Sequence, residues 1–349
     1  MKKRLFYFMA LAAALSACGE DYEPGEILLG ADFTLPEPEV TTRSESTSLQ
    51  GNYLATIQNH TGVYIYYKDA TSTSTDGAGY GYLNVGYTPQ AIADGKCDLS
   101  APTRTPYYPA SSSQNIDLYA YAPRFTNTTE PELSTQTAVS FTTQTDQSTD
   151  EKYIASDFIW GTLKDQVPKT KSGNSKLEIP MNHKMSKIQV KLVEGHSMAS
   201  KLAGATVQIN NVQPAGTLNL ITGDATVSSA TTGKVSVIMG KNLANATDAV
   251  AADYVSGGAP TDAAASHKVY EAACVIYPQT ISKSNLLEIT LSSNYGTTSY
   301  KFTDTGNQQF QAGMIYKYTI QVNATGIDLT TTVTDWATGA TISGEANYN

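Results

Sequence analysis

The segment ILLGADFTL, residues 27–35, decides how the first part of this chain folds, because its apolar residues recur at every second position. The recurring positions are Ile27, Leu29, Ala31, Phe33 and Leu35. Successive side chains of a strand point to opposite faces, so this period of two predicts a β-strand with one buried face. Pro36 and Pro38 follow and end it, because proline has no amide hydrogen to donate to a ladder.

The residues that precede this strand read as an export signal. A basic start is followed by an apolar core at residues 5–15, about half as long as the roughly 20 residues that a membrane helix needs. The core ends in Leu15-Ser16-Ala17-Cys18, which is typical of bacterial lipoproteins, where the cysteine thiol is acylated and the cysteine becomes the new N-terminus. We therefore predict a lipoprotein signal peptide at residues 1–18 and a palmitate-type lipid on Cys18. A non-lipidated signal peptide with a chance cysteine is the alternative.

Residues 19–43 form an acidic leader around the predicted strand. The leader ends at Arg43, which is the only arginine between Cys18 and Arg104, and the residues that follow, from Ser44, are polar. Proteases cut at such polar, loop-like stretches. A strand placed between a lipid anchor and a protease site points to a removable part, and so to assembly rather than catalysis. The alternative is that Arg43 is an ordinary surface residue of an anchored lipoprotein.

Composition restricts the partners of the chain. The formal net charge is −9 and no basic stripe is visible, which argues against nucleic acid as a partner. Only 16% of the residues are charged, while tyrosine occurs 22 times, and this balance is typical of β-rich secreted proteins. The length of 349 residues is enough for two ordinary domains.

Period-two segments continue to the C-terminus, and no long stretch keeps the period of 3.6 that an amphipathic helix requires. In residues 314–322, for example, the apolar residues alternate with polar ones. A polar stretch with Pro168 and Gly173 separates two groups of predicted strands. We therefore predict an all-β protein with a first domain at residues 44–175 and a second at residues 176–349.

Catalytic and metal-binding patterns are missing from the sequence. The four histidines share no ligand spacing, and there is no GxSxG motif. Besides Cys18 the chain has only Cys97 and Cys274, which lie far apart and form either a disulfide or two isolated buried thiols. The sequence predicts no enzyme activity, no cofactor and no metal site.

Two groups of residues are compatible with hydrolysis or binding of sugars. Asp150 with Glu151, and Asp157 near Trp160, have the residue types of a glycosidase pair, although sequence does not set their separation. A set of tyrosines has the chemistry to stack on sugars, and the alternative is that they pair across a half-exposed sheet. The set is Tyr64, Tyr66, Tyr67, Tyr80, Tyr82 and Tyr87.

Several short motifs, in a fixed order, resemble the Bacteroidales fimbrillin family, the type V pilins and related lipoproteins. The motifs are YYP at 107–109 followed by IDLYAYAP at 116–123, SDFIWG at 156–161, HKMSKI at 183–188, FQAGMIY at 310–316, and Asp335-Trp336. They span both halves of the chain, so the resemblance covers nearly all of it after the signal peptide.

The resemblance implies two tandem transthyretin-like Greek-key β-sandwich domains. It also implies a lipoprotein of the outer membrane that an arginine-specific protease cleaves between Arg43 and Ser44. The leader strand would occupy a groove of the first sandwich until cleavage removes it. A strand of another fimbrial subunit, identical or different, would then fill the groove by donor-strand exchange, with Gly326–Asn349 as the expected donor. The product is a fimbrium at the cell surface.

The expected function is therefore that of a structural fimbrial subunit for adhesion, at the shaft or the tip, with a ligand on a host or bacterial surface as a further partner. Two alternatives stay open. One is an uncleaved anchor or accessory lipoprotein of the fimbrium. The other is a surface lipoprotein that binds glycans through exposed tyrosines.

Overall fold

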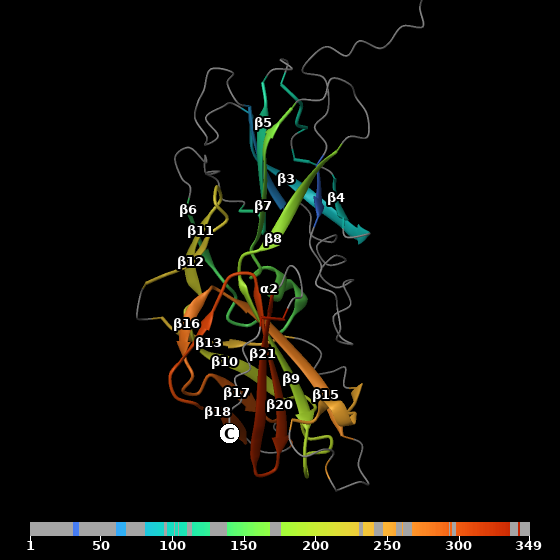
Figure 1. The fold of residues 1–349 in the computed structure, drawn as a ribbon, viewed down its shortest axis with the longest axis vertical. Helices are drawn as coiled ribbons and strands as arrows, with labels where there is room; N and C mark the ends of the chain where they lie inside the picture. The colour runs from blue at the N-terminus through green and yellow to red at the C-terminus, as the bar shows by residue number, and fades with distance from the viewer. Residues whose placement is uncertain are drawn as a thin grey trace, which may run out of the picture.

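In the computed structural model, the protein is built almost entirely of β-strands (Figure 1). The structure describes residues 31–34, 61–67, 81–93, 96–100, 102–103, 105–109, 114–125, 138–167, 176–229, 233–240, 247–255, 260, 267–292, 294, 298–335 and 341–342. These residues include one short α-helix, α2 (Asp150–Ile154), and one 3-10 helix, η1 (Ala251–Asp253). No helix among them has the length and apolar character that crossing a membrane requires.

Seven strands close into a barrel, which forms the upper part of the molecule in Figure 1. Their spatial order is β1 (Ala31–Thr34), β4 (Lys96–Ser100), β3 (Gly81–Ala93), β2 (Thr61–Tyr67), β5 (Ile116–Ala122), β7 (Ile159–Gln166) and β8 (Leu177–His183). The strand ladder closes because β1 pairs with both β4 and β8 and so joins the two ends of the sheet.

The barrel core is rich in aromatic side chains. Residues 61–66 of β2 and all of β5 are buried, so both faces of these strands are covered. Their sequences, apolar and aromatic with few polar interruptions, are those expected of strands covered on both faces. The rings of Tyr64 and Tyr121 stack at 6.1 Å, and Tyr121 stacks on Phe125 at 5.4 Å. Eight of the buried residues of the first core are tyrosines.

Below the barrel, a six-stranded sheet and a four-stranded sheet share a second core (Figure 1). The larger sheet has the order β14 (Thr247–Asp248), β15 (Lys268–Ile276), β9 (Ser186–Glu194), β20 (Met314–Asn323), β21 (Gly326–Asp335) and β22 (Thr341–Ile342). The smaller one has the order β13 (Val235–Ile238), β10 (Thr206–Val212), β17 (Leu287–Thr290) and β18 (Ser299–Phe302). A further pair is formed by β16 (Gln279–Ser282) and β19 (Asn307–Phe310).

A three-stranded sheet connects the barrel to the second core, in the order β12 (Ala225–Val227), β11 (Ala215–Asn219) and β6 (Ala138–Thr142). Strand β6 precedes the predicted domain boundary and β11 follows it. The first core likewise takes in Leu218, Val275 and Tyr277 from beyond that boundary. The division at residue 175 stays a prediction, and the two units it separates exchange strands and core residues.

The chain after β6 runs along the edge of the second unit. The amide of Gln147 donates to the carbonyl of Ile238 at 2.9 Å, and the amide of Ile238 donates to the carbonyl of Thr145 at 2.9 Å. The side-chain amide of Gln147 is buried and bonds both the N–H and the C=O of Val275, each at 2.8 Å. The Gln147 side chain therefore makes the two hydrogen bonds that a neighbouring strand would make with Val275 of β15. These bonds connect the two units.

Candidate functional site: the seat of the leader strand

The short strand β1, the dark blue strand between β4 and β8 in Figure 1, is the part of the predicted leader that the structure describes. It pairs with β4 in the antiparallel sense and with β8 in the parallel sense. Of the five predicted leader-strand residues it contains Ala31 and Phe33. Ile27, Leu29 and Leu35 lie outside the described residues, as do Cys18, Arg43 and Ser44.

The register of β1 on β8 shows which positions belong to the core face. Ala31 lies opposite Leu177 and Phe33 lies opposite Ile179. Leu177 and Ile179 are buried in the barrel core, whereas Glu178 and Pro180 between and after them are exposed. Because paired residues of neighbouring strands share a face of the sheet, Ala31 and Phe33 occupy core-face positions. Asp32 and Thr34 occupy positions on the solvent face.

The first half of β8 depends on β1 for its place in the sheet. Strand β7 pairs with β8 only through residues 181–183, whereas β1 pairs with residues 177–180. Within the described sheet, β4 has β1 and β3 as its neighbours, so loss of β1 would open one edge of β4. Sequence reasoning did not name Leu177 and Ile179 as part of this seat. Their alternation with Glu178 and Pro180 was the available signal.

The solvent face of the seat carries three acidic residues in one row. Asp32 of β1 is the register partner of Asp98 on β4 and of Glu178 on β8. Lys96 is the register partner of Thr34, two pairs further along. The register therefore places two acidic residues beside position 32 and one basic residue beside position 34.

The acidic residues that have the residue types of a glycosidase pair have structural roles or lie in the first turn of α2. The carboxylate of Asp157 is buried and contacts Nδ1 of His183 at 2.8 Å, where β8 ends. Asp150 and Glu151 lie in the first turn of α2. Trp160 donates from its indole nitrogen to the carbonyl of Leu220 at 2.8 Å. Asp157 and Trp160 therefore hold the junction between the barrel and the second unit. Among the described residues, no three His, Cys, Asp or Glu side chains gather closely enough to hold a metal ion.

The tyrosines proposed as a sugar platform are core residues where the structure describes their side chains. Tyr64, Tyr66 and Tyr87 are at most 3% exposed, so they offer no ring face to a ligand. The half-exposed sheet, the other expectation, is wrong for the same reason. Burial also raises the pKa of Tyr121 to about 12. The side chains of Tyr67, Tyr80 and Tyr82 lie outside the description.

The two internal cysteines belong to different parts of the fold. Cys274 on β15 is a free and fully buried thiol, and burial raises its pKa. Cys97 lies on β4 as a register partner of Phe33. The interpretation of Cys274 as an isolated buried thiol therefore holds.

The strand content, the seat of β1 and the order of the motifs agree with the family suggested by the sequence. A model of the fimbrillin-like family matches residues 42–336. The chain belongs to the fimbrillin-like family. It is 26% identical to a protein of Bacteroides uniformis named as the fimbrium subunit Fim1C, over 97% of both chains.

Solved structures of other proteins share the fimbrillin-like fold of this chain. One is a protein from Bacteroides uniformis described as a cell adhesion protein, with a TM-score of 0.54, 19% identity, and coverage of 88% of this chain and 98% of that one. A second, from Bacteroides ovatus and described in the same way, has a TM-score of 0.53, 15% identity, and coverage of 88% and 98%. At these identities the likeness concerns the fold alone.

Proposed function

We propose that this fimbrillin-like protein is a structural subunit of a cell-surface fimbrium. It is exported to the outer membrane as a lipoprotein on Cys18, cleaved after Arg43 and polymerised by donor-strand exchange, and the fimbrium serves adhesion. The observation that carries the proposal is the position of β1, which closes the barrel with residues that precede Arg43 in the chain. The relative named as a fimbrium subunit supports the same assignment.

The physical basis is that β1 pairs with β4 and β8 through few residues, so that another strand can replace it. In the described part of β1, Phe33 is the only large apolar residue whose register partner on β8 is a buried core residue, Ile179. The pairing with β8 spans four residues, and that with β4 spans three. Cleavage at Arg43 would free one end of the leader, so that its departure no longer requires the barrel to unfold. The edges of β4 and β8 would then accept another strand.

The donor must fit the seat that β1 leaves. If it enters in the same direction, it runs antiparallel to β4 and parallel to β8, with small or apolar residues opposite Leu177 and Ile179. The proposed donor is Gly326–Asn349 of a neighbouring subunit. In its own subunit, its first ten residues pair with β20, and residues 341–342 pair with β21. A donor and a seat at different places on one subunit produce a head-to-tail filament.

The domain architecture of the proposal is two tandem transthyretin-like units. Two separate hydrophobic cores support this division. The strand exchange at β6 and β11 and the clasp at Gln147 would keep the two units in one rigid arrangement. Such rigidity suits a subunit that transmits tension along a filament.

The decisive experiment is replacement of Arg43 in the full-length protein expressed in its own host. Surface-sheared material from the parent strain should begin at Ser44 on N-terminal sequencing. Arg43→Ala and Arg43→Lys should both abolish this start and the filaments seen by electron microscopy, because an arginine-specific protease rejects both residues. Ser44→Ala, which keeps the arginine, is the matched control and should assemble.

Two outcomes would contradict the proposal. Surface protein of the parent that begins only at Cys18 would remove the processing step and favour an anchored accessory lipoprotein. Filaments of normal length from Arg43→Ala would show that assembly needs no release of the leader strand.

A further inference from the structure

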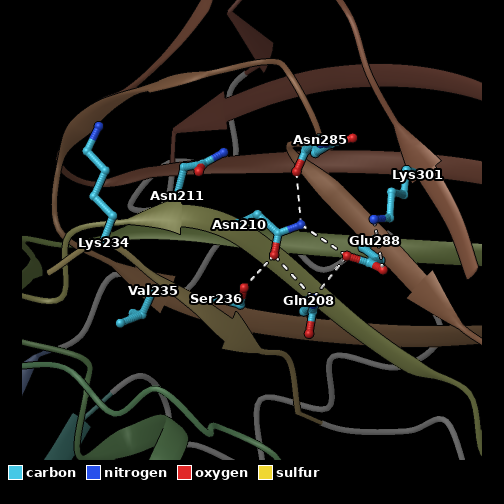
Figure 2. A pocket seen from close by; sticks show the side chains of 9 residues that line it. All are labelled: Gln208, Asn210, Asn211, Lys234, Val235, Ser236, Asn285, Glu288 and Lys301. Atoms are coloured by element: carbon cyan, nitrogen blue, oxygen red, sulfur yellow. Dashed lines mark hydrogen bonds and ion pairs between the residues drawn. The ribbon is translucent and has the colours of Figure 1, made fainter.

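The outer face of the four-stranded sheet contains a polar hollow of about 310 Å³ (Figure 2). Strands β10, β17, β18 and β13 supply most of its walls, and the turn before β17 supplies the rest. The lining residues are Gln208, Asn210, Asn211, Lys234, Val235, Ser236, Asn285, Glu288 and Lys301. A hollow of this volume holds the equivalent of about ten liquid waters. That is enough space for one sugar ring with its hydroxyl groups.

A saturated hydrogen-bond network fixes the floor of this hollow. Asn210 donates from Nδ2 to the carbonyl of Asn285 at 2.9 Å and to Glu288 at 3.4 Å. Its Oδ1 accepts from Ser236 at 2.6 Å and from Gln208 at 3.2 Å. One side chain thus ties together β13, β10, β17 and the turn before β17 (Figure 2). A floor held in this way does not need to be ordered when a ligand binds.

The rim of the hollow carries polar groups that the described part of the chain does not use. Among the described residues, no hydrogen bond engages Oε1 of Gln208, Oδ1 of Asn211, Nδ2 of Asn285 or Nζ of Lys234. Asn211 and Asn285 have positive φ values of 63° and 52°, which present their side chains from a tight bulge and a turn. Hydrogen-bond acceptors and donors with no partner among the described residues therefore surround the Asn210 network that forms the floor of the hollow.

The chemistry of the lining selects one class of ligand. Val235 is the only apolar lining residue, which excludes a hydrophobic ligand. The carboxylate of Glu288 lies 3.7 Å from Nζ of Lys301 and also disfavours a doubly charged anion such as phosphate. A pyranose ring offers adjacent hydroxyl groups, each of which donates and accepts, and so matches the mixed rim.

We propose that this hollow is a binding site for a single hydroxyl-rich sugar unit of a surface glycan. The inference rests on the proposed function, because it names the ligand class of the adhesion that a fimbrium would serve. An open polar site binds weakly on its own, but the subunits of a filament repeat it many times, and multivalency converts weak contacts into firm attachment.

Saturation-transfer NMR with the full chain tests the site, using three probes: methyl glycosides of neutral hexoses, of N-acetylhexosamines and of hexuronic acids. We expect transfer from at least one of these probes. Lys234→Ala and Asn211→Gly should each weaken its binding about fivefold, because each removes one hydrogen-bonding side chain. Glycine keeps the positive φ at position 211 without strain. Lys317→Ala, on the outer face of the other sheet, is the control and should bind like the parent.

Several results would overturn the site. They are no transfer from any of the three probes, equal binding by the parent and both variants, or binding of inorganic phosphate in place of sugars. Lys234 is exposed, so Lys234→Ala remains informative even if Asn211→Gly fails to fold. Filament formation and sugar binding by the parent protein separate this inference from the proposed function. A parent that forms normal filaments and binds no sugar would sink the sugar site alone, and a parent that binds sugar and forms no filaments would sink the assembly role alone.

Discussion

The first described strand of the chain and one of its last are held in very different ways. Strand β1 pairs through four residues and closes the barrel, whereas β21 pairs with β20 through ten consecutive residues. Leu329 and Thr331 of β21 are buried in the second core. The shorter strand has few pairings, while the longer one is part of the framework of its sheet. The proposed function requires this difference, because it makes β1 the strand that is removed.

The surroundings of the two strands reinforce this difference. The register of β1 places Asp32 between two acidic residues, one on β4 and one on β8. Strand β1 has one antiparallel partner, β4, and one parallel partner, β8. Strand β21 pairs with β20 on one side and with β22 on the other, inside one continuous six-stranded sheet. Removal of β21 would therefore disturb a cooperative unit, whereas removal of β1 would affect two edges.

The largest expected effect is from truncation after Thr325, which deletes β21. The second core would lose Leu329, whose burial contributes about 1.5–3 kcal/mol, together with a ten-residue ladder. Because domains are stable by only about 5–15 kcal/mol, we expect no cooperative unfolding of the second unit. Circular dichroism during thermal unfolding measures this. Truncation after Ile342, which keeps β21 and β22, is the control. An unchanged transition in the shorter chain would remove the contrast between β1 and β21.

A matched pair of charge insertions sharpens the contrast. Leu329→Asp places a charge in a framework strand and should cost about 4 kcal/mol or more of global stability. Phe33→Asp places the same charge at a core-face position of a strand that can detach. We expect loss of hydrogen-exchange protection in β4 and residues 177–180 of β8, with the second unit unchanged. Equal loss of protection throughout the molecule in both variants would mean that β1 is as firmly built in as β21.

The next largest effect on stability is expected where the Gln147 side chain bonds the backbone of Val275. Gln147→Ala would leave the buried N–H and C=O of Val275 without their side-chain partner, and we expect a loss of about 2–4 kcal/mol. Gln144→Ala, at an exposed glutamine three residues earlier, is the matched control. Urea unfolding of both variants measures the difference. Similar midpoints for the two variants would show that the units do not depend on this contact.

Alkaline pH should weaken the barrel through its buried tyrosines. Burial raises the pKa of Tyr121 from 10.0 to about 12, so the unfolded state ionises first as the pH rises. The stability that this neutral phenol supplies is complete below pH 10 and is lost between pH 10 and about 12, a change of about 2–3 kcal/mol. Unfolding free energies measured across this range in the parent and in Tyr121→Phe test the assignment. Identical pH dependence in the two proteins would contradict it.

The smallest effect concerns Asp32, whose register partners Asp98 and Glu178 are also acidic. Asp32→Thr removes a like charge opposite Asp98 and Glu178, and we expect the leader strand to be held more tightly by about 0.5–1.5 kcal/mol. The gain should shrink at high salt, because mobile ions screen exposed charges. Slower hydrogen exchange in residues 177–180 measures it at low salt. Faster exchange would show that Asp32 stabilises the seat.

Sequence periodicity located the long strand β20. The alternation in residues 314–322 matches it, since the period of two follows directly from strand geometry. The short strands β12, β13 and β14 were not predicted individually. These strands have two to four residues, too few to establish a period. The full burial of β2 and β5 was also missed, because alternation reports one covered face and not two.

The sequence by itself determined the all-β class, the family resemblance and the presence of an apolar strand before Arg43. Local spacing suffices for these, because side-chain direction in a strand depends only on position along the chain. Tertiary structure alone decided that β1 lies between β4 and β8, that β6 pairs across the predicted boundary, and that the tyrosines pack inward. Any edge strand offers the same backbone hydrogen bonds, so the choice among partners far apart in sequence comes from how the whole core packs.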